Sequence, residues 1–351
     1  MRAAAWFLAS PRIRVCCAAD VDTVVTDQPQ DVGFVIIGRN EGQRLVRCLE
    51  SVRAASGACI YVDSGSTDGS VAAALALGAQ VVELDMRQPF TAARARNAGF
   101  ARLSELGAVD LVQFLDGDCE MLPDWIAAAT ALLRARPEVV AVAGRRRERF
   151  PDATVFNRLC DIEWNTPVGE TTAVGGDALF RADALRAVGA YRDDLIAGEE
   201  PELCVRLRAA GGRIWRLDAD MTLHDAAITR WSQWWKRNVR SGHAFAEGAF
   251  LHGRPPERHF AAETRRALLW GAALPLAVLV LSFFTPWALA LLLAYPVQWL
   301  RIGARFARSG LPIPWRYAAF LIAARFPEAQ GAVKFTFGRM SGHRSGLIEY
   351  K

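Results

Sequence analysis

The amino-acid sequence predicts an α/β protein with a mostly parallel sheet flanked by helices, followed by helices that enter a membrane. Two observations lead to this prediction. Between residues 32 and 142, short apolar runs alternate with segments of about 10 to 15 residues whose apolar positions recur at helical spacing. From Ala267 to Leu300 there is no charged residue. Apolar residues make up 52% of the 351 positions, which excludes an intrinsically disordered chain.

Five strands are expected in the first half of the chain, each a short apolar run bounded by polar residues. They cover residues 32–37, 59–62, 81–84, 111–115 and 139–142. Apolar side chains at helical spacing predict a helix after each of the first four strands. The third of these helices begins at Thr91 and continues to about Leu106. Since strand–helix–strand crossovers are right-handed, this order predicts a mostly parallel sheet.

The second half of the chain is less regular. From about residue 145 to residue 198 no single period dominates. Pro201 suits the first position of a helix that ends at Gly211, and residues 214–217 indicate one more strand.

The uncharged stretch from Ala267 to Leu300 predicts a membrane anchor. As one helix it would run about 50 Å, against a hydrocarbon core of about 30 Å. One strongly tilted span and two shorter spans are both compatible with that length. We prefer two spans of about 17 residues each that turn near Thr285 and Pro286. The alternative is a buried pair of helices in a soluble protein.

Arginines lie on both sides of this stretch. They are Arg254, Arg258, Arg265 and Arg266 before it, and Arg301, Arg305 and Arg308 after it. Positive charge on both flanks favours a hairpin whose two ends are cytoplasmic. Residues 311–324 contain Arg316 and are too short to span, so we expect a helix lying in the interface, followed by a basic tail.

Two carboxylates, Asp116 and Asp118, follow the fourth strand with Gly117 between them. Carboxylates two residues apart at a strand end project to the same side, where they repel each other unless a cation lies near. Mg²⁺ or Mn²⁺, which prefer oxygen ligands, would remove that repulsion. An isolated pair of this kind is more often a solvated turn. Its position directly after an apolar strand favours a ligand site here.

Other polar residues follow the remaining strands, at the sheet edge where such folds bind ligands. Asn40 and Glu41 come after the first strand. Asp63 closes the second, where a carboxylate can accept hydrogen bonds from a base or ribose; a simple turn is the alternative. Arg96, near the start of the third helix, suits phosphate or ribose, and a solvated helix face is its alternative.

Glu199 and Glu200 stand at the entrance of the helix that Pro201 predicts. A carboxylate in this position is often only a cap that the helix dipole stabilises. Its functional interpretation is a general base that takes a proton from an acceptor hydroxyl. His224 follows the last expected strand; a lone histidine is more often structural, and a metal role requires other ligands nearby.

An aromatic and basic cluster at residues 231–240 includes Trp234, Trp235 and Arg237. Aromatic faces stack on sugar rings, and cations bind diphosphates. An anchor at the membrane surface is the alternative, and the two roles do not exclude each other. The net charge of +5 is too small and too dispersed to predict nucleic-acid binding.

Taken in order, these segments resemble the family 2 glycosyltransferases of the GT-A fold, of the membrane-associated bacterial type. The resemblance covers about residues 32–250. Its parts are Gly38-Arg39-Asn40-Glu41, Asp63 to Gly69, Ala95 to Gly99, Asp116-Gly117-Asp118, Val174-Gly175-Gly176-Asp177, and Gly198 to Leu207. Each part is modest alone, but the full set in this order is specific.

The resemblance implies a Rossmann-like sheet, a nucleotide-sugar donor, Mg²⁺ or Mn²⁺, and inversion at the anomeric carbon. It implies donor binding by Asn40, Glu41, Asp63, Arg96, Asp116 and Asp118, metal binding by Asp118, Asp116 and His224, and acceptor binding by Gly176, Trp234, Trp235 and Arg237. Glu200 is the implied base and Glu199 its rival. The family more often has Asp at this position, so Glu200 is a departure.

On this basis we expect three parts. Residues 1–30 form a loosely ordered leader, and residues 31–250 form the GT-A domain, with a nucleotide-binding half at about 31–119 and an acceptor half at about 120–250. Residues 251–351 carry the membrane hairpin, at about 267–300, the interfacial helix and the basic tail.

The predicted activity is transfer of one sugar to a hydroxyl of a lipid-linked or growing cell-surface glycan, at the cytoplasmic face of the plasma (inner) membrane. Residues 233–238 only approximate the Q-x-x-R-W motif of processive members, which favours single transfers. Expected partners are the donor, the glycan acceptor, membrane lipid and other glycan-assembly proteins, without nucleic acid. The alternative is a catalytically silent component that binds nucleotide-sugar or glycan in an assembly complex. A dinucleotide-dependent oxidoreductase is disfavoured because no G-x-G-x-x-G follows the first strand.

Overall fold

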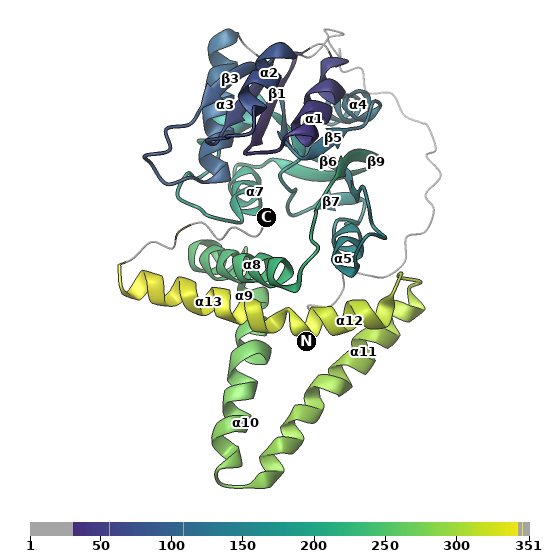
Figure 1. Cartoon of the computed structure of the whole chain (residues 1–351), viewed down its shortest axis with the longest axis vertical. Helices are drawn as coiled ribbons and strands as arrows, with labels where there is room; N and C mark the ends of the chain where they lie inside the picture. The colour runs from purple at the N-terminus through teal and green to yellow at the C-terminus, as the bar shows by residue number, and fades with distance from the viewer. Residues whose placement is uncertain (1–30, 56, 108, 343–345, 347–351) are drawn as a thin grey trace.

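The computed structural model describes residues 31–55, 57–107, 109–342 and 346. The predicted leader (1–30) lies outside the described residues. Most of the segment expected to be a basic tail after residue 324 is described, and it forms a helix at Arg325–Met340. An α/β domain occupies the upper part of Figure 1. Helices α8, α13 and α12 cross beneath it, and a helical hairpin projects away from them on the side opposite the sheet.

One nine-stranded sheet forms the centre of the α/β domain, in the order β3-β2-β1-β4-β8-β6-β9-β5, with β7 paired to β9. Its strands are β1 (Val32–Gly38), β2 (Cys59–Asp63), β3 (Gln80–Glu83), β4 (Leu111–Asp116), β5 (Cys119–Met121), β6 (Val139–Glu148), β7 (Gly169–Thr171), β8 (Ala178–Arg181) and β9 (Arg213–His224). β1 pairs in parallel with β2 and β4, and β8 runs antiparallel between β4 and β6. The predicted α/β class is confirmed. The sheet is mixed rather than mostly parallel, because four of its eight strand pairings are parallel and four are antiparallel.

The helices of this domain are α1 (Gln43–Arg53), α2 (Ser70–Ala76), α3 (Ala92–Leu106), α4 (Trp125–Ala135), α5 (Val155–Glu163), α6 (Ala182–Ala187), α7 (Glu199–Ala209) and α8 (Trp231–His252). The Thr91 side chain accepts a hydrogen bond from the Arg94 backbone amide and begins α3 as predicted. The predicted start of α7 is wrong. Gly198, with φ of 80°, breaks the chain direction, so the helix begins at Glu199 rather than Pro201.

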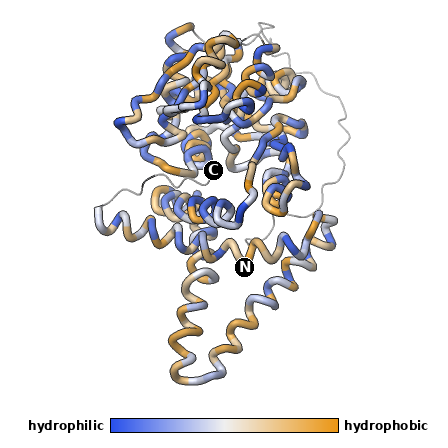
Figure 2. The backbone as a smooth tube through the Cα atoms, viewed as in Figure 1, coloured by the Kyte–Doolittle hydropathy of each residue, from blue (hydrophilic) through white to orange (hydrophobic). Residues whose placement is uncertain are grey.

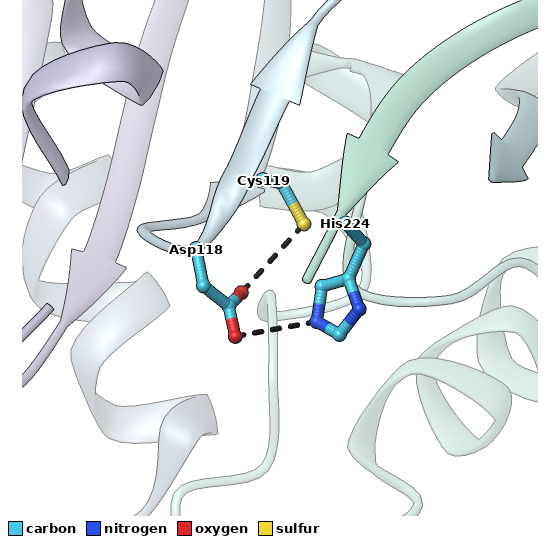
Figure 3. Close-up of side chains that lie close together, drawn as sticks. All are labelled: Asp118, Cys119 and His224. Carbon is cyan, nitrogen blue, oxygen red and sulfur yellow. Dashed lines mark hydrogen bonds and ion pairs between the residues drawn. The ribbon is translucent and has the colours of Figure 1, made fainter. Parts of the chain in front are cut away.

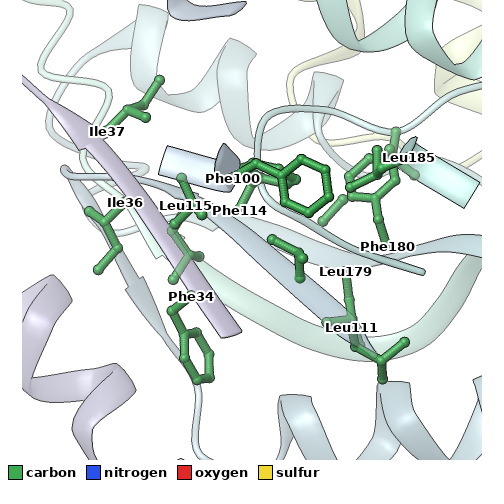
Figure 4. Packing of buried hydrophobic residues seen from close by; sticks show 14 of the residues in the cluster. Phe34, Ile36, Ile37, Phe100, Leu111, Phe114, Leu115, Leu179, Phe180 and Leu185 are labelled. Atoms are coloured by element: carbon green, nitrogen blue, oxygen red, sulfur yellow. The ribbon is translucent and has the colours of Figure 1, made fainter. Parts of the chain in front are cut away.

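The apolar strands pack into one core with the helices that flank them. Phe34 and Leu111 are fully buried, and Phe114 meets Phe180 edge to face with ring centroids 5.8 Å apart (Figure 4). The antiparallel β8 supplies Phe180, so a strand that the sequence did not predict completes the core between β4 and β6. Burial on both faces explains why the runs of β1 and β4 are continuously apolar.

Two further helices cross under the domain, α12 (Pro314–Ala323) and α13 (Arg325–Met340). α13 crosses α8 in direct backbone contact. A Cβ at Gly242 of α8 would lie 1.9 Å from the Glu328 carbonyl oxygen, and one at Gly331 of α13 would lie 2.0 Å from the Val239 carbonyl oxygen. Only glycine permits this approach, so the α/β domain and the lower helices are held at close range.

The hairpin has two arms. The first runs continuously through α9 (Ala261–Leu268), η1 (Leu269–Ala273) and α10 (Leu274–Ser282), and the second through η2 (Pro286–Leu293) and α11 (Ala294–Arg308). The arms have 22 and 23 residues, so each is long and apolar enough to cross a membrane. The predicted length of about 17 residues is too short, because the helices continue into the flanking arginines.

The apolar side chains of the hairpin face outward. Phe283, Phe284 and Trp287 at the turn are each 82% exposed, and Figure 2 shows apolar residues along both arms. A buried helical pair of a soluble protein would cover these side chains. The turn near Thr285 also separates two arms, so the alternative of one tilted span does not describe this structure.

Candidate active site

A cavity of about 790 Å³ opens at the carboxyl ends of β1 and β4. Residues from the sheet, from α7 and from α8 line it together. Ten of the thirteen predicted site residues are among them: Asn40, Glu41, Arg96, Asp116, Asp118, Gly176, Glu199, Glu200, His224 and Arg237. Most of the side chains predicted from their positions at strand ends therefore lie together in one cavity.

Arg96 connects the two acidic groups of this cavity. Its guanidinium donates from Nη2 to Asp116 Oδ1 at 2.9 Å and from Nη1 to Glu199 Oε1 at 2.9 Å. The same Nη1 lies 3.1 Å from Glu200 Oε1. Arg96 is only 2% exposed, so these interactions take place away from solvent, where they are strong. The solvated helix face is therefore the wrong interpretation of Arg96.

A second arginine, Arg146, forms an ion pair with the other carboxylate oxygen of Asp116. Its Nη2 lies 3.4 Å from Asp116 Oδ2 and 2.9 Å from Asp177 Oδ1. Asp177 in turn accepts hydrogen bonds from the Thr222 hydroxyl and the Asp116 backbone amide. Burial alone would raise the pKa of Asp116, but Arg96 and Arg146 outweigh it and the pKa lies below its usual value.

Sequence reasoning assigned no role to Arg146 or Asp177. Arg146 is the middle residue of a run of three arginines. Because side chains alternate along a strand, Arg146 points to the opposite face from its two neighbours, and in the structure it lies opposite Thr222. That alternation is the feature of the sequence that could have identified Arg146. Asp177 belongs to a segment noted for its glycines, and its burial depends on contacts with β4 and β9 that sequence does not reveal.

Asp118 and His224 come together from β9 and the turn after β4. His224 Nε2 lies 3.3 Å from Asp118 Oδ2, and Cys119 Sγ lies 3.7 Å from Asp118 Oδ1 (Figure 3). The His224 ring packs edge to face on Trp164, with centroids 4.7 Å apart, which fixes the imidazole. All three side chains are buried.

This donor set fits a divalent cation. A carboxylate and an imidazole nitrogen face each other at a distance that one ion could bridge, and both are ligands that Mn²⁺ accepts. Asp116 lies in the same cavity, but its two oxygens are engaged by Arg96 and Arg146. The geometry therefore favours Asp118 and His224 over Asp116 as residues that would hold a cation.

Glu200 has a pKa raised to about 7. Burial is the largest cause and the neighbouring Glu199 carboxylate adds to it, while Arg96 opposes both. Glu200 is also the more accessible of the two glutamates, since its side chain is 15% exposed against 4% for Glu199. A carboxylate with a pKa near neutrality, on the wall of a cavity, has the properties of a general base.

Asn40 and Asp63 hold the turns around the cavity. Asn40 Oδ1 accepts a hydrogen bond from the Thr67 amide at 2.7 Å. The oxygens of Asp63 accept from the Tyr61 hydroxyl and from the Gly65 and Ser66 amides. Asp63 is buried and does not line the cavity, so its observed contacts are those of the turn, and binding of the base stays a prediction.

Trp234 and Trp235 do not line the cavity. Trp234 is buried, with its ring 5.3 Å from that of Phe320 on α12, and Trp235 donates to Gln330 on α13 at 2.8 Å. Both side chains therefore pack between α8 and the helices α12 and α13. These contacts are neither the predicted stacking on a sugar nor the predicted anchor at a membrane surface. Arg237 does line the cavity, and it pairs with Glu163 at 2.8 Å.

Comparison with known proteins agrees with this geometry. Residues 34–187 match the family model of glycosyl transferase family 2. This segment is therefore similar to the domain of the family 2 glycosyltransferases. The match includes Arg96 and the Asp116-Gly117-Asp118 turn and ends before the two glutamates.

Two curated proteins share part of this domain. A TPR repeat-containing protein of Synechococcus elongatus is 31% identical over 137 residues, which cover 39% of this chain and 32% of that protein. The succinoglycan biosynthesis protein ExoA of Rhizobium meliloti is 30% identical over 206 residues, covering 53% of this chain and 60% of ExoA. The chain thus matches less than two thirds of the length of either relative.

A solved structure extends the likeness to nearly the whole chain. The mannosyltransferase PcManGT from Pyrobaculum calidifontis, in complex with GDP-Man and Mn²⁺, superposes with a TM-score of 0.58 over 88% of this chain and 91% of that one. At 20% sequence identity this likeness establishes the fold. The GT-A fold expected from the sequence is confirmed.

Replacing Arg96 with Met tests its role as the centre of the site. Asp116, Glu199 and Glu200 would lose their shared cation, so we expect a loss of about 3–5 kcal/mol in the free energy of unfolding. Thermal or denaturant unfolding measures it, with Arg102→Met, an exposed position on the same helix, as the control. Equal stability of Arg96→Met and Arg102→Met would contradict the burial of these charges.

Proposed function

We propose that this protein transfers one sugar from a nucleotide-sugar donor to a hydroxyl of a lipid-linked or growing cell-surface glycan, with a divalent cation and inversion at the anomeric carbon. The bridge that Arg96 makes between Asp116 and the Glu199–Glu200 pair carries this proposal. It sets the acidic donor-binding group and the candidate base on two sides of one guanidinium. A single displacement requires such an arrangement, because base and leaving group act on opposite faces of the sugar.

The donor side is supported by the residues around Asp118. Asp118 and His224 would hold Mg²⁺ or Mn²⁺, which when bound offsets the negative charge of the departing nucleoside diphosphate. Asp116, whose pKa Arg96 and Arg146 lower, lines the same cavity and would accept hydrogen bonds from the ribose. The mannosyltransferase PcManGT, which shares the fold, was solved with GDP-Man and Mn²⁺.

Glu200 is our choice for the base. It is less deeply buried than Glu199, and its pKa of about 7 lets it accept a proton near neutral pH. Arg96 Nη1 contacts both glutamates and orients Glu200 on the cavity wall. Gly176 keeps the neighbouring space free, since a Cβ there would lie 2.6 Å from Arg96 Nη2.

The part of the cavity that we assign to the acceptor is lined by both arginine and aromatic side chains. α8 contributes Arg237, Arg240 and Phe245 to the cavity, and Phe260 follows from the loop before α9. Guanidiniums suit a phosphate or diphosphate, and aromatic rings suit a sugar face or an isoprenoid. This lining supports a lipid-linked acceptor better than a small soluble one.

The hairpin supports attachment to the plasma (inner) membrane. Its two arms expose apolar side chains, and both connect to the α/β domain on the same side. Arg265 and Arg266 on one arm and Arg305 and Arg308 on the other lie at that side. Positive charge at both ends of the hairpin supports a cytoplasmic position for the catalytic cavity. α12 and α13 cross the base of the hairpin, as interfacial helices would.

Glu200→Gln and Asp118→Asn together test the assigned roles. We expect Glu200→Gln to lower kcat by at least about a hundredfold while nucleotide-sugar binding persists, because only proton transfer is removed. Asp118→Asn should abolish both transfer and the cation dependence of donor binding. Radiolabelled sugar transfer and calorimetry measure these effects, with Glu105→Gln, an exposed change, as the control. Full activity of Glu200→Gln would leave the silent binding component as the better explanation.

The pKa of Glu200 predicts how transfer depends on pH. Below about pH 7 the carboxyl is protonated and cannot accept a proton, so kcat/KM should fall tenfold per pH unit on the acid side. The rate profile of the wild type should therefore bend near pH 7. The residual activity of Glu200→Gln should lack this bend; the same bend in that variant would assign it to another group.

Cysteine labelling tests the hairpin topology. In intact cells, a membrane-impermeant maleimide should label Thr285→Cys at the turn, whereas Ser309→Cys after α11 should react only once the cells are lysed. The unsubstituted protein supplies the background from its own cysteines. Protection of Thr285→Cys until lysis would show that the hairpin does not cross the membrane.

A further inference from the structure

The three consecutive arginines of β6 divide between two cavities. Arg146 faces the catalytic cavity, whereas Arg145 and Arg147 line a second one of about 430 Å³ together with Arg216 of β9. The other side chains around this second cavity are Asn165, Asp218, Ala219 and Asp220. The two sets are disjoint, so the second cavity is not an extension of the first.

Strand register explains the division. β6 and β9 run in parallel, with Arg146 opposite Thr222, whose hydroxyl bonds Asp177 in the catalytic cavity. Arg216 is opposite Ala143, two residues before Arg145. Alternation along β6 sends Arg145 and Arg147 to the face away from Arg146. The register with β9 shifts on both sides of Arg145, and Arg216 lines the same cavity as Arg145.

Arg216 is an unusual residue for such a position. It is only 4% exposed, and its Nε is buried without a hydrogen-bond partner. Within the described part of the chain it forms no ion pair, and its one hydrogen bond goes to the neighbouring Leu217 carbonyl. A buried guanidinium without a carboxylate is costly in free energy, so its presence on a cavity wall indicates a missing anion.

The surrounding charges do not supply that anion. Arg145 pairs with Asp161 at 3.2 Å, and its own Nε is also buried without a partner. Asp220 pairs with Arg147 at 3.1 Å, and both Asp220 and Asp218 are exposed. Burial and the nearby Arg145 lower the pKa of Arg216 below its usual value, and they outweigh the opposing effect of Asp218 and Asp220. The two exposed aspartates therefore compensate the Arg216 charge only in part.

We propose that the second cavity binds an oxyanion, a carboxylate or phosphate group, through the guanidiniums of Arg216 and Arg145. The buried guanidinium of Arg216 and the half-buried guanidinium of Arg145 line one wall, and each can donate hydrogen bonds to such a group. A volume of about 430 Å³ accommodates a sugar-sized molecule that carries it. The source is either an acidic sugar of a glycan or a free phosphate compound.

The site lies close behind the metal-binding wall of the catalytic cavity. Asn165 follows Trp164, the residue that packs on His224 and lies under Arg146 at 5.5 Å. The oxyanion site nevertheless requires neither donor nor cation, so its test is independent of sugar transfer.

Calorimetry on the full-length protein in detergent tests the proposal, with inorganic phosphate, glucuronate and glucose as probes. We expect phosphate or glucuronate to bind the wild type and glucose not to bind. Arg216→Met should weaken binding at least tenfold, the effect of losing one or two charge-assisted hydrogen bonds. Arg213→Ala, on the same strand but outside the cavity, should bind like the wild type.

Binding of phosphate alone would identify a phosphate compound as the ligand, and binding of glucuronate alone an acidic sugar. Either result supports the site when Arg216→Met abolishes it. The proposal is overturned if neither anion binds the wild type, or if Arg216→Met binds as tightly as Arg213→Ala. Arg145→Met serves as a second variant, and circular dichroism with thermal unfolding establishes that each variant folds. Without ligand, Arg216→Met should melt no lower than the wild type, because it removes an unpaired buried cation.

Discussion

The buried guanidinium of Arg96 is the interaction on which the candidate site depends. Without it, Asp116, Glu199 and Glu200 would repel one another in a cavity that screens charge poorly. With it, one planar group joins the end of β4 to the first turn of α7. The folded chain thereby fixes the separation between Asp116 and the two glutamates, to which we assign donor binding and proton transfer. Arg146 forms a second ion pair with Asp116, so each oxygen of this carboxylate contacts one guanidinium.

Helix α8 connects the cavity to the helices that we assign to the membrane surface. One of its faces supplies Arg237, Arg240 and Phe245 to the cavity, and another packs on α13 through Gly242. Trp234 and Trp235 contact α12 and α13 and do not line the cavity, so the two tryptophans hold α8 against these helices. The wall of the cavity that we assign to the acceptor is thus fixed directly against the helices that we assign to the membrane surface. A lipid-linked acceptor would meet both at once.

Much of the fold was predictable from the sequence, and the strands that were not predicted share one physical cause. Long apolar runs predicted β1, β2 and β4, and an uncharged stretch of chain predicted the hairpin. β5, β7 and β8 have three or four residues each, too few for a period to be recognised, and form because neighbouring strands supply their hydrogen bonds. The tryptophan cluster was assigned to two roles because composition reveals an aromatic surface but not which element covers it.

The sequence by itself determined the order of strands and helices, the acidic pair at the end of β4, the glutamates near α7 and the apolar hairpin, since each follows from residue types at short spacing. Only the tertiary structure decided the partners of these groups. Arg96 and Glu199 are 103 positions apart, and Asp118 meets His224 only because β5 pairs with β9. Charges act through space at a few ångströms, so the pairs that set the pKa of Glu200 and leave Arg216 without a partner exist only once distant segments of the chain are folded together.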